Sequence, residues 1–124
     1  MKQLFFAFLL TFTAFAAQSQ QVAWKELDDY HTVMSQTFHP SEEGNLKPIK
    51  ERSGELAAKA KTLQKSAIPT AHQKPGVKET LVKLAKESKA LDKIVRKKKS
   101  DEEITKTLAA LHDRFHEVME KCHH

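Results

Sequence analysis

The sequence predicts an all-α protein, an antiparallel bundle of four helices that run up, down, up and down. Helix-forming Ala, Leu, Lys and Glu dominate, and the chain has only three glycines. Four segments carry apolar residues at a spacing of three or four, the period of a helix with one buried face. Proline and glycine fall between these segments. Helices of similar length joined by short connections pack as antiparallel neighbours.

The first helix is expected from Val22 to Phe38. It should end there because His39 precedes Pro40, and the residue before a proline avoids the helical region. Its apolar stripe at helical spacing consists of Trp24, Leu27, His31, Met34 and Phe38. This pattern places one histidine, His31, on the face that turns toward the core.

The second helix is expected from Leu46 to Ser66 and the third from Pro75 to about Lys99, with a loop between them. Pro48 is tolerated in a first turn. The second stripe consists of Leu46, Ile49, Ser53, Leu56, Ala60 and Leu63. The third consists of Val77, Leu81, Leu84, Ser88, Leu91 and Val95. Each of these stripes therefore contains one serine, Ser53 or Ser88.

The fourth helix has the clearest start, because Ser100 followed three residues later by Glu103 forms a capping box. Its stripe consists of Ile104, Leu108, Leu111, Phe115, Val118 and Cys122. Cys122 is the only cysteine, so no disulfide within the chain is possible. Its place on the apolar stripe predicts a buried thiol.

Residues 1–19 have the pattern of a secretory signal peptide. Lys2 supplies the positive start, an apolar run extends from Leu4 to Ala17, and small residues follow at cleavage spacing. The run is short for a membrane span. We therefore expect a periplasmic or secreted protein, with residues 20–124 as one domain and no membrane segment after cleavage.

The formal net charge of +5 is mild and is spread along amphipathic helices. The one dense basic cluster consists of Lys93, Arg96, Lys97, Lys98 and Lys99. It lies at an expected helix C-terminus, where the helix dipole favours cations. Aromatic residues are not interleaved with it, so the pattern does not indicate nucleic-acid binding.

Four polar residues are expected at one height in the bundle. On antiparallel neighbours, the numbers of facing residues add up to a nearly constant value. This rule brings together one residue from each helix: His31, Ser53, Ser88 and His112. A histidine in an apolar interior must satisfy its ring nitrogens. His31 is therefore either a core histidine bonded to a serine or part of a ligand site.

A transition metal is the first ligand that fits. His112 and His116 are four residues apart on one helix face, a common spacing for two ligands to one metal. His31 would supply a third nitrogen and Asp28 a carboxylate, a set that suits zinc, whereas Met34 would shift the preference toward copper. The second ligand that fits is non-covalent haem. It would be held between His31 or Met34 on one helix and His112 or His116 on the other.

An exported four-helix bundle with histidines on its first and last helices resembles the small periplasmic b-type cytochromes and the cytochrome c-prime class. Cys122-His123 near the end of the fourth helix is similar to the Cys-His pair late in those chains. The resemblance implies a haem-binding bundle. The Cys-x-x-Cys-His motif for covalent haem is absent from the chain, so any haem would be held without thioether bonds.

Two further patterns have modest interpretations. His112 to His116 is close to the zincin motif, but Asp113 stands in place of the catalytic Glu and a small bundle offers no cleft. We expect no enzymatic activity. The stretch from His39 to Asn45 mixes a histidine with two carboxylates, as either a polar connection or a surface metal site. The alternative to a metal or haem protein is a cofactor-free interaction or stress-response module with a structural histidine layer.

Overall fold

The computed structural model describes residues 23–123, and the expected signal peptide lies outside this range. The described part is all-helical and has no strand, which confirms the predicted class. The helices are α1 (Lys25–Glu42), α2 (Lys47–Lys65), α3 (Val77–Arg96) and α4 (Asp101–His123). A short 3₁₀ helix, η1 (Thr70–His72), lies within the connection that was expected to be irregular. None of the helices in residues 23–123 is long and apolar enough to cross a membrane.

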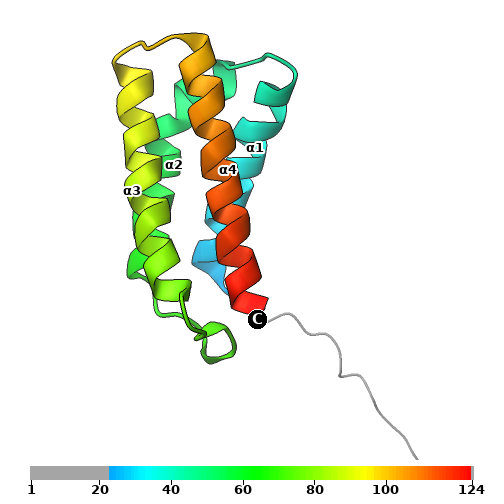
Figure 1. The fold of residues 1–124 in the computed structure, drawn as a ribbon, viewed down its shortest axis with the longest axis vertical. Coiled ribbons are helices and arrows are strands. Elements are labelled where there is room, and N and C mark those ends of the chain that lie inside the picture. The colour runs from blue at the N-terminus through cyan, green and yellow to red at the C-terminus, as the bar shows by residue number, and fades with distance from the viewer. Residues whose placement is uncertain (1–22, 124) are drawn as a thin grey trace, which may run out of the picture.

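The helices form one bundle, shown in Figure 1. The α1–α2 and α3–α4 connections lie at one end of it, and the α2–α3 connection lies at the other end beside the C-terminus (Figure 1). Around the bundle α1 packs on α2, α2 on α3 and α3 on α4. The seam between α1 and α4 is the most loosely packed of the four.

The core lies along the centre of the bundle. On α2, α3 and α4 the buried residues follow the predicted stripes, with Ser53, Ser88 and Cys122 buried as expected. Val95 is the exception, being only partly buried. Complete burial of one Leu, Ile or Val side chain contributes about 1.5–3 kcal/mol. These stripes therefore supply most of the stability of the bundle.

The stripe predicted for α1 is wrong at His31, while Trp24, Leu27 and Met34 are buried as predicted. Tyr30, not His31, faces the core, and His31 is exposed. The buried residues of α1 are Leu27, Tyr30, Val33, Met34, Thr37 and Ser41. Tyr30 and His31 lie three and four residues after Leu27, so either residue fits the helical spacing of three or four. The core takes the tyrosine because its large ring buries more apolar surface and its hydroxyl finds a partner on α3.

The expected end of α1 at Phe38 is also wrong, because the helix continues to Glu42 with Pro40 inside it. Pro40 lacks an N–H and so removes one hydrogen bond of the helix. The last turn is nevertheless held by Ser41 Oγ, which donates to the Phe38 carbonyl over 2.6 Å, and by the Glu43 N–H, which donates to the Pro40 carbonyl.

The connection between α3 and α4 is tight. α3 ends at Arg96, earlier than expected, and Lys98 adopts a left-handed backbone with φ of 57°. Ser100 Oγ accepts the N–H of Glu103 over 3.1 Å, as the capping box predicts. This short connection sets the height of α4 against α3.

Candidate metal site

The structure brings two of the predicted metal ligands together on α4. His112 and His116 occupy successive turns, and their Nε2 atoms lie 3.3 Å apart. The ring centroids are 4.5 Å apart and the ring planes are inclined by 73°. His112 is half-buried and His116 is exposed. The two nitrogens therefore face each other at the surface of the protein, where a metal ion can reach them.

Phe38 of α1 holds the ring of His112 in place. The two rings are stacked, with centroids 3.8 Å apart and an angle of 6° between the planes. Burial lowers the pKa of His112 below its usual value, and the nearby His116 lowers it further, while Asp113 and Glu42 act in the opposite direction. A lowered pKa keeps the imidazole neutral at neutral pH. Neutral imidazole is the form that binds a metal.

A second pair of polar side chains lies at the end of α1, next to Phe38. His39 Nδ1 and Glu42 Oε1 are 3.2 Å apart, and both side chains are exposed. The His39 ring lies 5.8 Å from the Phe38 ring. Of the smaller effects on the pKa of His112, that of Glu42 raises it and that of His39 lowers it.

His31 does not lie in an interior polar layer, which corrects the predicted position. Its exposed ring packs on Phe115 of α4, with centroids 5.1 Å apart. Asp28 is exposed as well and contributes to the wall of a small cavity of about 90 Å³ beside Trp24, His72 and Cys122. Met34 is 1 % exposed and belongs to the core. His31 and Asp28 thus lie on the outside of α1, whereas Met34 lies in the core.

The two serines are buried, but neither bonds to a histidine. Ser88 Oγ lies 2.9 Å from the hydroxyl of Tyr30, and Ser53 Oγ donates to Asp92 Oδ1 over 2.8 Å. Burial raises the pKa of Tyr30 well above its ordinary value. The interior polar contact therefore joins a tyrosine to a serine, and the histidines remain near the outside.

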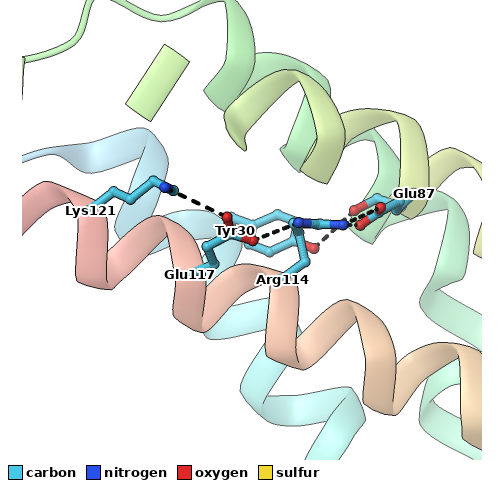
Figure 2. A network of polar contacts seen from close by, with 6 residues as sticks. Tyr30, Glu87, Arg114, Glu117 and Lys121 are labelled. Atoms are coloured by element: carbon cyan, nitrogen blue, oxygen red, sulfur yellow. Dashed lines mark hydrogen bonds and ion pairs between the residues drawn. The ribbon is translucent and has the colours of Figure 1, made fainter. Parts of the chain in front are cut away.

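A network of charged residues covers Tyr30 on the side of α3 and α4, as Figure 2 shows. Arg114 of α4 donates through Nε and Nη2 to the two carboxylate oxygens of Glu87 on α3, over 2.8 and 2.9 Å. It also donates to Glu117, which pairs with Lys121. This network joins α3 to α4 and contributes no side chain to the histidine pair.

The larger hollows lie elsewhere. One of about 450 Å³ runs between α2 and α3 and is lined by alanine, lysine, Gln64 and Val82, none of which is a predicted ligand. Within residues 23–123, no group of three or more His, Cys, Asp or Glu side chains is gathered closely enough to hold a metal ion. The pair His112–His116 is therefore the centre of the candidate site, with His39 and Glu42 as its neighbours.

Tyr30 and the neighbourhood of His39 and His112 escaped the sequence interpretation. Tyr30 lies three residues after Leu27 and four before Met34, so the helical period alone accommodates it. His39 and Glu42 are suitable ligands at the end of α1, yet only the fold brings the neighbouring Phe38 against α4. No family model, curated protein or solved structure matches the chain. The chemistry of the site is therefore inferred from these side chains themselves.

Proposed function

We propose that this chain is a small exported protein, an antiparallel up-down-up-down four-helix bundle, that binds a transition-metal ion through His112 and His116. The observation that carries the proposal is the 3.3 Å separation of the two Nε2 atoms. Two imidazole nitrogens bound to one tetrahedral zinc ion at about 2.0–2.1 Å lie about 3.3–3.4 Å apart. The separation thus matches that at a zinc ion, and it is also short enough for one ring to donate a hydrogen bond to the other.

Zinc fits this separation better than divalent copper. Adjacent nitrogens around a square-planar ion at about 2.0 Å lie about 2.8 Å apart, so copper would have to draw the rings together. Met34, the residue that favoured copper, is inside the core. His112 stacks on Phe38, so the plane of the His112 ring is set before a metal binds.

Haem receives less support from the geometry. An axial ligand on α1 would be His31 or Met34, but these residues lie on different sides of the helix, one exposed and the other buried. The ring contacts in the described part of the chain join His31 to Phe115, and join His112 to Phe38 and His116 but not to His31. A metal ion needs far less space than a porphyrin and fits at the surface between two adjacent turns.

The position of the pair suggests what the metal is for. A zinc ion held by two surface histidines keeps coordination positions for water or for a ligand from another protein. Such an open site suits the transport or buffering of a metal outside the cytoplasm. The proposal includes no catalytic role.

The test is zinc binding by tag-free protein, measured by equilibrium dialysis with elemental analysis. We expect one equivalent of zinc, with affinity reduced at least about tenfold in His112→Ala and in His116→Ala. Replacement of both terminal histidines, His123 and His124, by alanine is the control and should leave binding intact. An absorption spectrum of the purified protein tests haem, because a Soret band would contradict the zinc proposal.

Protein that takes up neither zinc nor copper above the background of the His112→Ala/His116→Ala double variant would overturn the proposal. The bundle would then be an interaction module without a cofactor, and partner proteins would be sought. A circular-dichroism spectrum of each variant shows that a loss of binding does not arise from unfolding, because both histidines lie at or near the surface.

A further inference from the structure

At the end of α1 a carboxylate lies close to a histidine, as it does beside many histidines that bind a metal. A histidine that binds a metal through one nitrogen almost always donates its other ring N–H to a carboxylate, a carbonyl or water. His39 Nδ1 and Glu42 Oε1 are 3.2 Å apart, three residues along the same helix. Donation from Nδ1–H to Glu42 leaves the lone pair of His39 on Nε2, where a metal can bind it.

Phe38 connects this pair to the histidine pair of α4. The Phe38 ring stacks on His112 and lies 5.8 Å from the ring of His39, the next residue along the chain. The two pairs thus come from helices far apart in the sequence, and Phe38 bridges the seam between α1 and α4, the loosest of the bundle.

We propose that His39 is the third ligand of a zinc ion bound by His112 and His116, that it binds through Nε2, and that Glu42 is its positioning residue. This inference rests on the metal-binding function proposed above. Three imidazole nitrogens with water at the fourth position form the ligand set of an open zinc site. Bundle closure across the α1–α4 seam would then be coupled to metal binding.

The third ligand has to move to reach the metal, since no group of three ligands is gathered in the described part of the chain. The side chains of His39 and Glu42 are 65 % and 55 % exposed, so they can turn without disturbing the core. Pro40 follows directly and removes one hydrogen bond from the last turn of α1. The bonds from Ser41 Oγ to the Phe38 carbonyl and from the Glu43 N–H to the Pro40 carbonyl hold the backbone of this turn, so the movement is one of the side chains.

His31, the third nitrogen expected from the sequence, is less well placed. Its ring packs on Phe115, whose side chain belongs to the core. His39 instead lies beside the aromatic ring that stacks on a ligand. Because His31 and His39 are both exposed histidines of α1, they form a matched pair of test and control.

The experiment is two-bond ¹H–¹⁵N NMR of the histidine side chains, recorded on the intact protein before and after one equivalent of Zn²⁺. This measurement reads each ring nitrogen separately. We expect the Nε2 signals of His39, His112 and His116 to move, with Nδ1 of His39 remaining protonated, and the signals of His31 to stay in place. In dialysis, His39→Ala should lose at least about tenfold in affinity, and Glu42→Gln less, while His31→Ala should match the wild type.

The outcomes separate this inference from the function on which it rests. If the wild type takes up no zinc, the proposed function fails and the third ligand fails with it. If the wild type binds zinc and His112 and His116 respond, but His39 stays unchanged and His39→Ala keeps full affinity, only the third ligand is overturned. A response of His31 in place of His39 would also overturn it, in favour of the ligand expected from the sequence.

Discussion

The hydroxyl groups of Tyr30 and Ser88 lie 2.9 Å apart in the interior of the bundle. Both residues are 0 % exposed, and they join α1 to α3, which stand diagonally across from each other. Each hydroxyl group satisfies the other in a place where water cannot. This contact takes the position at which the sequence analysis expected a histidine.

Tyr30→Phe is expected to destabilise the protein by about 1–3 kcal/mol, because the hydroxyl of Ser88 is then buried without its partner. Ser88→Ala should act in the same way by leaving the hydroxyl of Tyr30 unpaired. The measurement is the free energy of unfolding from urea denaturation, for each variant and the wild type.

The double variant Tyr30→Phe/Ser88→Ala removes both hydroxyl groups and is the control. Replacing both partners of a buried hydrogen bond by apolar groups is close to neutral. We therefore expect the double variant to be more stable than either single variant or equal to the better one. Additive losses in the double variant would show that the two hydroxyl groups do not interact.

Stability is expected to fall in alkali because of Tyr30. Burial raises its pKa in the folded state above the value of about 10 in the unfolded chain. Above pH 10 the unfolded state loses a proton that the folded state keeps, so the free energy of unfolding falls by up to about 1.4 kcal/mol per pH unit. Below pH 10 this group has no effect.

Tyr30 is the only tyrosine of the chain, so its ionisation is read directly from tyrosinate absorbance. We expect this absorbance to appear together with the loss of helical circular dichroism, and the alkaline transition to weaken in Tyr30→Phe. Tyrosinate that forms near pH 10 while the helices stay intact would contradict the enclosed hydroxyl.

The Arg114–Glu87 ion pair is expected to matter less, although it has two hydrogen bonds. Both side chains are partly exposed, at 27 % and 40 %, and pairs of this kind contribute about 0.2–1 kcal/mol. Arg114→Met should therefore lower the free energy of unfolding by less than about 1 kcal/mol. The loss should shrink further in high salt, since salt screens exposed charges. A loss larger than that of Tyr30→Phe would contradict this ranking.

Cys122 is expected to react slowly with thiol reagents. The residue is 2 % exposed, and burial raises the pKa of its thiol, with Lys74 opposing the shift slightly. The thiolate is the reactive form, so the rate of disulfide exchange at pH 8 should be at least about tenfold lower in folded than in unfolded protein. Fast modification of the native protein, before any denaturant is added, would show that the end of α4 opens.

Several features could be read from the residues of each helix alone. The four helices, the Ser100 cap and the stripes of α2, α3 and α4 depend on local spacing and composition. The relative heights were also predictable. Glu87 of α3 pairs with Arg114 of α4 close to the height at which Ser88 and His112 were expected to face each other. Tyr30 of α1 contacts Phe115 of α4 about one residue from the height expected for His31 and His112.

The choice between Tyr30 and His31 as the core residue of α1 was decided only by tertiary packing. Both residues lie at helical spacing between Leu27 and Met34, which are buried in either case. The choice depends on which side chain buries more apolar surface and finds a partner on a distant helix, here Ser88 of α3. The same holds for the candidate site: the spacing of His112 and His116 is a property of one helix, whereas the approach of Phe38, His39 and Glu42 requires α1 and α4 to meet.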